Sequence, residues 1–410
     1  MNMNRIILIG NGFDLAHGLP TSYQQFVRWY CDQRINAFVG NITDTSSDLL
    51  CSFQDLRGQV WNVNAFNNGY NLHNACGKDI IDHLIKDKKF FKTTMAPFFK
   101  NIYQSIETKG WVDIENEYYN LLVKYAIKEN SKENLSELNQ QLQYIQGLLI
   151  QYLSLVCRNC PQTIGSIARK IYEPIKTSDI AIGSSQALLD HIDMWMKQDE
   201  AWANNKIARY GLDGAEYLQE ITNYKQFRNS NYPLLGEFPR LYMLPDSILL
   251  LNFNYTPTDC LYINKNVCGV THIHGELEKP QSIIFGYGDE QDKNYEPLKD
   301  LNDNDCLCNI KTSKYLESDN YRNALSFLDF APFQVYIMGH SCGNSDRTLL
   351  NTIFEHKNCI SIKPYYYVKE DGTDNYLELI QNISRNFTDM KLMRDRVVNK
   401  TYCEPLVSNN

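Results

Sequence analysis

The sequence lacks a hydrophobic run long enough to cross a membrane. Its least polar stretch, residues 147–157, is about half as long as the ~20 apolar residues that a membrane-spanning helix needs. The first apolar run, residues 6–9, ends at a glycine and falls short of the ~7–15 apolar residues of a secretory signal peptide. We therefore expect a cytoplasmic protein with no membrane partner.

The sequence also lacks an excess of positive charge. Its 410 residues include 40 lysines and arginines against 48 aspartates and glutamates, which gives a net charge of −8. Proteins that bind nucleic acid without sequence preference neutralise phosphates with a surplus of basic side chains. This charge balance argues against non-specific nucleic-acid binding, although it leaves room for a local basic pocket.

The 12 cysteines do not follow the spacing of a zinc site. A structural zinc site takes four ligands, usually from two close pairs of residues. The pairs Cys157/Cys160 and Cys306/Cys308 lie far apart in the chain, and the spacing of the second pair is wrong. We expect no metal and, in a reducing compartment, free thiols.

Short apolar runs typical of buried strands lie near both ends of the sequence. They cover residues 5–9, 248–253, 270–274, 282–285, 335–338 and 360–368. The long region between the first two runs is mainly helical, and from Leu135 to Val156 apolar residues recur every three or four positions. Strands that alternate with helices favour a parallel sheet.

We therefore expect an α/β fold, with a parallel sheet that carries helices on both faces and is interrupted by a large all-helical insertion. Residues 1–40 and 243–402 would form the discontinuous sheet domain. Residues 41–242 would form the insertion domain, and residues 403–410 a flexible tail.

Four polar motifs stand where predicted strands end. They are Gly-Asn-Gly-Phe-Asp at residues 10–14, Asn-Phe-Asn-Tyr-Thr at 252–256, His-Ile-His-Gly at 272–275 and Gly-His-Ser-Cys-Gly at 339–343. Ligands of open α/β sheets bind beyond the carboxyl ends of the strands. We therefore expect Gly12, Asn254, His274 and Ser341 to converge on one cleft.

The glycine motif has two interpretations. Glycines let a ligand approach the backbone, and amides at a helix N-terminus favour anionic groups. However, Leu15 replaces the third glycine of a G-x-G-x-x-G fingerprint. A plain strand-to-helix turn, with Asp14 and Ser22 as helix caps, explains the same residues.

The next two motifs are equally open. Asparagines are poor strand residues, so Asn252 and Asn254 either present amides to a ligand or form an Asx turn before Pro257. His272 and His274 share one face of a strand, and each could be a buried core residue or a base that works near pH 7.

The last motif reads as G-x-S-x-G, the nucleophile elbow of α/β-hydrolases. In that fold an acid and then a histidine follow the serine. After Ser341 the sequence offers only His356, with Asp346 or Glu355 as the acid, all close behind the elbow. This hydrolase interpretation is the weaker alternative.

Six blocks of the sequence resemble the AbiH family of bacterial phage abortive-infection proteins. They are residues 10–23, 111–115, 252–256, 273–275, 285–289 and 339–346, in the expected order over nearly the whole chain. The resemblance implies an anti-phage defence protein.

A more distant resemblance is to sirtuin-like domains, which bind NAD on a Rossmann-like sheet. Gly10, Gly12, Gly18 and Pro20 fall in register with the sirtuin-like G-A-G-I-S and G-I-P-D-F-R blocks, and Asn254 with the asparagine of T-Q-N-x-D. The later H-G and G-x-S blocks match His274, Gly339 and Ser341, and Asp346 resembles the aspartate of bacterial defence members.

This second resemblance implies a sirtuin-like site for NAD or a related nucleotide. It assigns His274 as the catalytic base and Asn254 as the amide that holds a water or a ribose hydroxyl. The implied nucleotide-binding residues are Gly10, Asn11, Gly12, Phe13, Asp14, Gly18, Pro20, Thr21, Tyr23, Asn252, Thr256, Gly339, Ser341 and Asp346. The backbone amides of residues 10–13 would hold the pyrophosphate.

Some residues depart from the sirtuin pattern. Thr256 stands where an aspartate would contact nicotinamide, and Ser22 and Tyr23 replace Phe-Arg. The zinc-binding cysteine pairs of protein deacylases are absent, so deacetylation is not expected. The open alternatives are NAD hydrolysis at the nicotinamide–ribose bond and a non-catalytic nucleotide-binding sensor or scaffold. The implied partners are a phage-encoded trigger and a second copy of the chain in a homo-oligomer.

Overall fold

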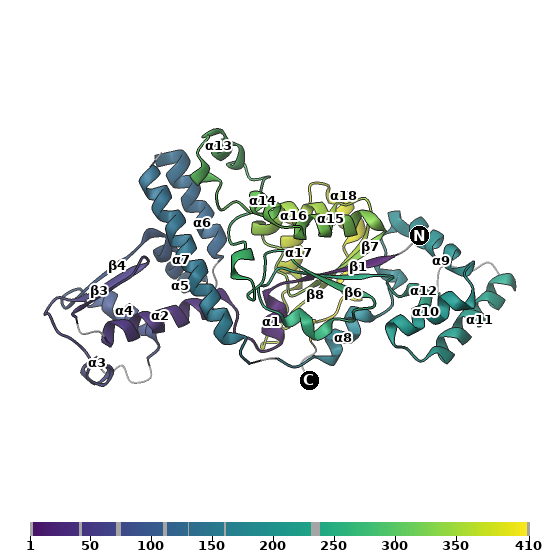
Figure 1. The fold of residues 1–410 in the computed structure, drawn as a ribbon, viewed down its shortest axis with the longest axis horizontal. Helices are drawn as coiled ribbons and strands as arrows, with labels where there is room; N and C mark the ends of the chain where they lie inside the picture. The colour runs from purple at the N-terminus through teal and green to yellow at the C-terminus, as the bar shows by residue number, and fades with distance from the viewer. Residues whose placement is uncertain are drawn as a thin grey trace.

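A five-stranded parallel sheet forms the centre of the molecule (Figure 1). The computed structural model describes residues 3–40, 43–70, 75–109, 113–129, 131–159, 161–230 and 238–407. In the order in which they pair, the strands are β6 (Cys268–His272), β5 (Ile248–Asn252), β1 (Asn4–Ile9), β7 (Phe333–Met338) and β8 (Cys359–Tyr365). This order corresponds to the first five strands of the Rossmann arrangement. The predicted α/β class with a parallel sheet is confirmed.

Both faces of the sheet are covered, which explains why its strands are continuous apolar runs instead of alternating patterns. On one face Ile6 and Leu8 share a core with α15 (Asn320–Phe330) and α16 (Arg347–Phe354), beside α17 (Tyr376–Arg385) and α18 (Met390–Arg396). On the other face Ile7 and Ile9 pack with α1 (Asn11–Ala16) and α8 (Gly165–Tyr172).

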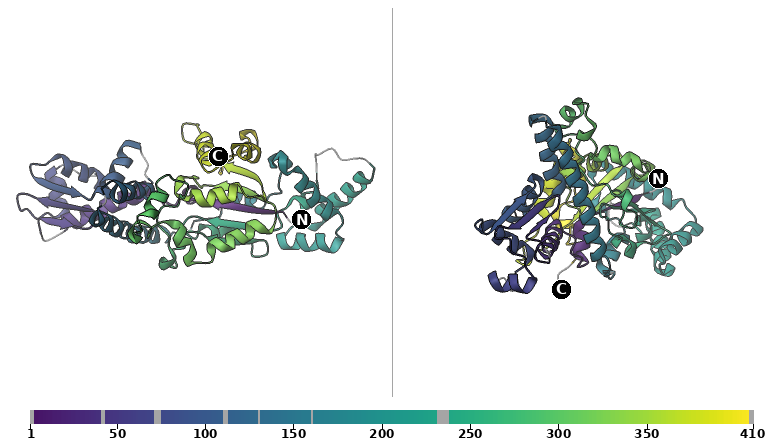
Figure 2. Two further views of the ribbon diagram at one scale, coloured as in Figure 1. Left: turned by 90° about the horizontal axis from the view of Figure 1, so that it is seen from above. Right: turned by 60° about the vertical axis from the view of Figure 1, so that its left-hand side comes forward.

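Apart from α1 and α8, the helices between β1 and β5 form two groups at opposite ends of the sheet (Figures 1 and 2). One group contains α2 (Tyr23–Val39), α3 (Val63–Tyr70), α4 (Gly77–Lys86), α5 (Pro97–Lys109), α6 (Ile114–Val123) and α7 (Lys132–Val156). The other contains α9 (Ser185–Met196), α10 (Glu200–Tyr210), α11 (Gly214–Ser230) and α12 (Arg240–Met243). The predicted domain boundaries stay a prediction.

The insertion is not all-helical as predicted. The first group carries an antiparallel sheet of β2 (Thr45–Ser47), β3 (Cys51–Asp55) and β4 (Phe91–Met95). In β3 alternate residues are buried, so the strand has the period of two that half-buried strands show. Its five residues are too few to stand out among long helical patterns.

Two helix expectations are confirmed: Ser22 caps a helix, and the apolar residues between Leu135 and Val156 lie on one helix. Helix α2 begins with a capping box, in which the Ser22 hydroxyl accepts from the Gln25 backbone N–H and the Gln25 side chain lies 3.1 Å from the Ser22 nitrogen. Helix α7 buries the predicted apolar stripe, including Leu135, Leu142 and Leu149. Within the described ranges, no helix combines the length and the apolar character that a membrane span requires.

Two other predictions are wrong. Residues 282–285 are not a strand, because Pro280–Ser282 form a 3-10 turn and this segment joins no sheet. Residues 403–407 are not a free tail: the Leu406 N–H donates to the Tyr366 carbonyl, and the Lys170 ammonium donates to the Pro405 and Leu406 carbonyls. Residues 408–410 lie outside the described residues.

The turns that follow β1 and β7 are in backbone contact. The Gly12 N–H donates to the Gly339 carbonyl at 2.8 Å. A Cβ atom on Gly10 would lie 2.5 Å from the His340 Cα, and one on Gly339, whose φ is +77°, would lie 2.0 Å from the Phe13 nitrogen. These glycines are required because no side chain fits between the two turns.

Replacement of Gly10 by alanine should therefore destabilise the fold. We expect Gly10→Ala to lower the free energy of unfolding by ~1–3 kcal/mol, since backbone atoms must move apart. The matched control is Gly147→Ala in α7, where a Cβ meets nothing within 4 Å and the gain in helix propensity should raise stability by ~0.5–1 kcal/mol. Urea denaturation measures both, and equal stability of Gly10→Ala and wild type would contradict the close contact.

Candidate functional site

A cavity of about 910 Å³ lies at the carboxyl edge of the sheet. The segments that follow β1, β5, β6 and β7 form one part of its wall. Residues of the α6 and α7 regions and of the C-terminal segment from Tyr365 to Val407 complete it. The cavity is therefore bounded by the sheet, by the insertion and by the end of the chain.

Most residues that the sequence assigned to a ligand site line this cavity. Gly12, Asn254, His274 and Ser341 all do so, as the shared edge of the strands predicts. The predicted residues found in the lining are Gly10, Asn11, Gly12, Asp14, Thr21, Tyr23, Asn254, Thr256, His274, Gly339, Ser341 and Asp346. Their roles toward a ligand stay predictions.

Phe13, Gly18 and Pro20 are not in the lining. Phe13 is fully buried in the core beneath the sheet. Gly18 has a φ of +76° just after α1, the left-handed conformation that commonly ends a helix. The Pro20 carbonyl accepts a hydrogen bond from Tyr152 of α7. Phe13 therefore belongs to the core, and Gly18 and Pro20 belong to the turn after α1. The sequence motif had suggested that all three bind a ligand.

Asn252 forms the Asx turn that was the alternative interpretation of its motif. Its Oδ1 accepts from the Asn254 backbone N–H at 2.8 Å, and its Nδ2 donates to Asp259 at 2.6 Å. Asn252 is fully buried and lies outside the lining. The Asn254 side chain donates to the Gly10 carbonyl at 3.0 Å, which ties the end of β5 to the end of β1.

The expected phosphate grip of residues 10–13 is wrong in its atomic detail. The Gly12 N–H donates to the Gly339 carbonyl and the Phe13 N–H to the Gly10 carbonyl, both at 2.8 Å. The Gly10 N–H donates to the Met338 carbonyl at 3.4 Å. These three amides are already hydrogen-bonded within the chain: those of Gly10 and Gly12 to the end of β7 and the turn after it, and that of Phe13 within its own turn.

Asp14 is a buried acid on the cavity wall. Its Oδ2 accepts a hydrogen bond from the Thr256 hydroxyl at 2.6 Å. Burial raises the pKa of Asp14 to about 6, although the hydrogen bonds from Thr256 and other side chains lower it. Thr256, which departs from the sirtuin pattern, therefore donates a hydrogen bond that stabilises the Asp14 carboxylate.

His274 is buried and held on one nitrogen. Its Nε2 lies 3.1 Å from Asp346 Oδ1 and 3.1 Å from the Tyr315 hydroxyl. Burial and then the positive charge of Lys311 lower the pKa of His274 below its ordinary value, against the opposing effect of Asp346. His274 is thus a neutral imidazole at neutral pH, as a general base must be.

His272 lies in a different environment. Its Nε2 is 3.3 Å from Asp259, and it is absent from the cavity lining. Burial lowers the pKa of His272, but the hydrogen bond and charge of Asp259 outweigh burial, so the pKa is raised. The two histidines of the motif are therefore chemically distinct.

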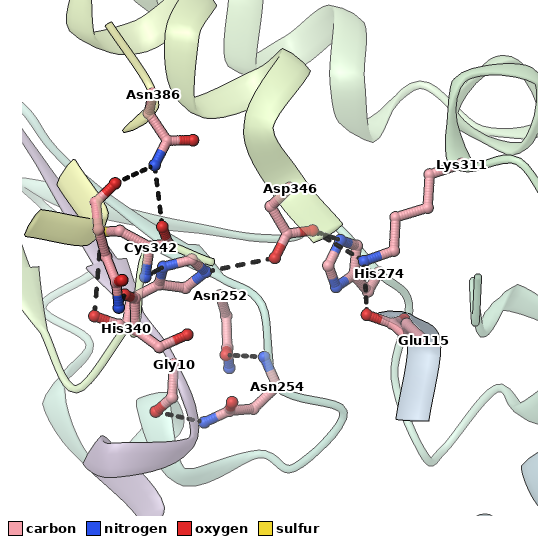
Figure 3. A network of polar contacts seen from close by, with 12 residues as sticks. Gly10, Glu115, Asn252, Asn254, His274, Lys311, His340, Cys342, Asp346 and Asn386 are labelled. Atoms are coloured by element: carbon pink, nitrogen blue, oxygen red, sulfur yellow. Dashed lines mark hydrogen bonds and ion pairs between the residues drawn. The ribbon is translucent and has the colours of Figure 1, made fainter. Parts of the chain in front are cut away.

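A buried cation, which sequence reasoning missed, stands beside His274 (Figure 3). Lys311 of α14 (Lys311–Lys314) is fully buried. Its Nζ lies 2.8 Å from Asp346 Oδ1 and 3.0 Å from Glu115 Oε2. Burial alone would raise the pKa of Asp346, yet Lys311 and then His274 hold it well below its usual range.

His340 completes the surroundings of Asp346. The Cys342 backbone N–H donates to His340 Nδ1 at 3.0 Å. A neutral His340 therefore carries its proton on Nε2, which lies 3.6 Å from Asp346 Oδ2. Asp346 thus faces two histidines and a lysine, which makes it an orienting group within the chain.

The sequence contained a signal for two of these missed residues and none for the third. Glu115 lies in the block at residues 111–115 and His340 in the block at 339–346, so the family resemblance contained both. Lys311 lies in a segment without a motif, and only the fold brings it to Asp346.

The hydrolase alternative is wrong. His356, its required base, packs its ring against Phe333 and lies 3.4 Å from Asp329. Phe333 begins β7, whereas Ser341 follows the end of that strand. A six-residue strand is ~20 Å long, so the two side chains lie at opposite edges of the sheet.

Metal ligands do not gather in the described part of the chain. Within it, no group of three or more histidine, cysteine or acidic residues could hold a metal ion. Cys160, of the first cysteine pair, lies outside the described residues.

Comparisons with known proteins give one extensive match. The family model described as "Bacteriophage abortive infection AbiH" matches residues 6–367. A protein of Rickettsia bellii (strain RML369-C), described as a putative export ATP-binding/permease protein, is 25% identical over 137 residues. That likeness covers 32% of this chain and 24% of the relative, so the chain spans about a quarter of the relative's length. No solved structure matches the chain.

The raised pKa of Asp14 predicts a pH-dependent stability. Between the unfolded pKa of 3.8 and the folded pKa of about 6, the folded state holds a proton that the unfolded state has lost, so this contribution falls as pH rises. Asp14→Asn keeps the acceptor for Thr256 and cannot ionise. Relative to wild type, the variant should therefore gain ~1–3 kcal/mol of unfolding free energy between pH 4 and pH 7.

Urea denaturation at the two pH values measures this difference. Every other titrating group is common to both proteins, so the comparison isolates Asp14. A stability difference that is the same at pH 4 and pH 7 would show that Asp14 ionises normally.

Proposed function

This chain belongs to the AbiH family of bacteriophage abortive-infection proteins, and from that membership we propose that it defends bacteria by acting on a nucleotide. The proposed ligand is NAD or a related nucleotide, bound in the cavity at the carboxyl edge of the sheet. The proposed reaction is hydrolysis of the nicotinamide–ribose bond.

The observation that carries the proposal is the convergence of strand-end polar groups on one large cavity. Asn254 follows β5, His274 follows β6 and Asp346 follows β7, and all three line it. Ligand pockets are roughly 300–1,000 Å³, so a cavity of about 910 Å³ suits a ligand as large as a dinucleotide. The position also agrees with the rule for ligands of open α/β sheets.

The chemistry asks little of the protein beyond a base and charge stabilisation. The bond between the nicotinamide nitrogen and ribose C1′ breaks, and its electron pair stays on nicotinamide, which becomes neutral. Water adds to the oxocarbenium-like C1′ and loses a proton to His274. The products are nicotinamide, ADP-ribose and a proton, and Asn254 would hold the water or a ribose hydroxyl.

The charge of the lining fits one end of NAD better than the other. Among the described residues, the lining has carboxylates from Asp14, Asp113, Glu115, Asp346 and Glu378 but no lysine or arginine. Acidic groups near His274 suit the cationic nicotinamide ring and the cationic transition state. The pyrophosphate would need neutral donors, such as the Ser341 hydroxyl.

A second candidate function is a nucleotide-binding sensor without catalysis. The specific observation in its favour is that the groups proposed for chemistry are already paired. Asn254 donates to the Gly10 carbonyl, and Nε2 of His274 is held by Asp346. Such a site could bind a nucleotide and signal through the helical insertion.

We expect expression of this protein to protect a bacterial culture from some phages through death or arrest of infected cells. The reason is its family membership. Plaque counts and infected-cell survival over a broad phage panel measure the effect, with His274→Ala expressed at the same level as a control. Equal plaque numbers with and without the gene, for every phage, would contradict this role.

The enzymatic claim has its own test. Purified protein is incubated with NAD, with and without extract of phage-infected cells, and released nicotinamide is measured. General-base contributions are ~10²–10⁴-fold, so His274→Ala should reduce turnover by about that factor while the protein stays folded. Asn254→Ala should behave similarly and still bind nucleotide.

His272→Ala is the matched control, since it removes the neighbouring histidine of the same motif. It should lower the melting temperature through loss of the Asp259 contact more than it lowers turnover. If triggered wild type leaves NAD intact but binds it, the sensor function replaces the enzyme. If His274→Ala cleaves NAD as fast as wild type, His274 is not the base.

A further inference from the structure

Lys311 is a buried cation that does not line the cavity. Its side chain is fully buried, and its ammonium lies between the carboxylates of Asp346 and Glu115. Glu115 is itself fixed, because its Oε1 accepts from the Gly286 backbone N–H at 3.2 Å. The ammonium is therefore pinned from two sides, one of them on the insertion helix α6.

Asp346 connects this cation to His274. A single oxygen, Oδ1, lies 2.8 Å from Lys311 Nζ and 3.1 Å from His274 Nε2. A cation at this distance keeps the carboxylate ionised, and an ionised Oδ1 at 3.1 Å from Nε2 favours the tautomer that carries its proton on Nε2. The unprotonated nitrogen of a neutral His274 is then Nδ1, for which no partner exists among the described residues.

Among the groups around His274, Lys311 is the cation whose charge lowers the pKa of the imidazole. The groups facing the imidazole are Asp346, Tyr315, His340 and the Phe253 ring, with Lys311 behind Asp346. A positive charge there opposes protonation of the imidazole, whereas Asp346 favours it. Loss of Lys311 would therefore remove one of the effects that oppose Asp346 and leave burial as the main one.

We propose that Lys311 is the positioning residue of this site: through Asp346 it fixes the tautomer of His274 and keeps the imidazole in its basic form. This assignment rests on the role of His274 in the proposed function. It adds a residue that touches no ligand and that ties the base to the insertion through Glu115.

The structure offers a matched control for a buried lysine. Lys363 of β8 pairs with Asp179 at 2.9 Å, both side chains are fully buried, and neither lines the cavity. Lys311→Met and Lys363→Met each leave buried acid unpaired, so both should lower the melting temperature. Only Lys311→Met should change His274.

The first measurement needs no substrate. The eight histidines are labelled with ¹³C, the His274 signal is assigned with His274→Gln, and its titration is followed by NMR. In Lys311→Met we expect the pKa of His274 to rise toward its ordinary value, because one of the effects that lower it is gone, whereas Lys363→Met should titrate like wild type. If Lys311→Met does not fold, the double variant Lys311→Met/Glu115→Gln is titrated in its place. In the double variant only the Asp346 carboxylate has lost its cation.

The second measurement uses the reaction. A raised pKa of His274 leaves less base at pH 7, so Lys311→Met should lose kcat/KM there and recover it as the pH rises to 8–9. Lys363→Met should keep the pH profile of wild type. A purely structural Lys311 predicts a loss of activity that is the same at every pH.

The two measurements distinguish a failure of the role of Lys311 from a failure of the proposed hydrolysis. An unchanged His274 titration in folded Lys311→Met overturns the role of Lys311, whatever the activity. A wild type that never releases nicotinamide overturns the proposed hydrolysis, while the NMR titration still decides whether Lys311 controls His274.

Discussion

Backbone contact between the turns after β1 and β7 is the constraint on which the site depends. No side chain fits where Gly10, Gly12 and Gly339 meet, so the two turns are locked together by main-chain atoms. The first turn carries Asp14 to the cavity and the second carries His340 and Asp346. The same contact consumes amides that a Rossmann-type site would offer to phosphate. The rigidity of the wall and the loss of the phosphate grip therefore have one cause.

Buried charge is the second determinant of the site. An isolated buried ion is too costly to keep, so Lys311 requires its two carboxylates, and these in turn require Lys311. Burial raises the pKa of Glu115 to about 7 even beside that lysine, with Asp346 as a further cause. The cluster holds two acids and one cation, and nothing among the described lining residues adds a lysine or arginine. A cationic ring is thus better matched to this end of the cavity than a phosphate.

Much of the fold could be predicted because its signals are local. The strands of the central sheet are short apolar runs, and Ser22 marks the start of α2 as a helix cap. Pro364 did not exclude a strand because β8 lies at the edge of the sheet. The small strands β2, β3 and β4 were missed because three to five residues give too short a pattern. Strand-end placement predicted Asn254 and His274 in one cavity, but Lys311 reaches Asp346 only through tertiary packing.

The insertion belongs to the site and is not merely attached to the sheet. Asp113 and Glu115 come from the start of α6 and Leu149 and Leu153 from α7, and all four line the cavity. The hydrogen bond from Tyr152 to the Pro20 carbonyl fixes α7 to the segment after β1. Removal of the insertion would therefore open the cavity and take Glu115 away from Lys311, which would keep only Asp346 of its two carboxylates. The ion pair between Glu115 and Lys311 joins α6 of the insertion to α14, so the insertion also supplies one of the two carboxylates that hold the cation near His274.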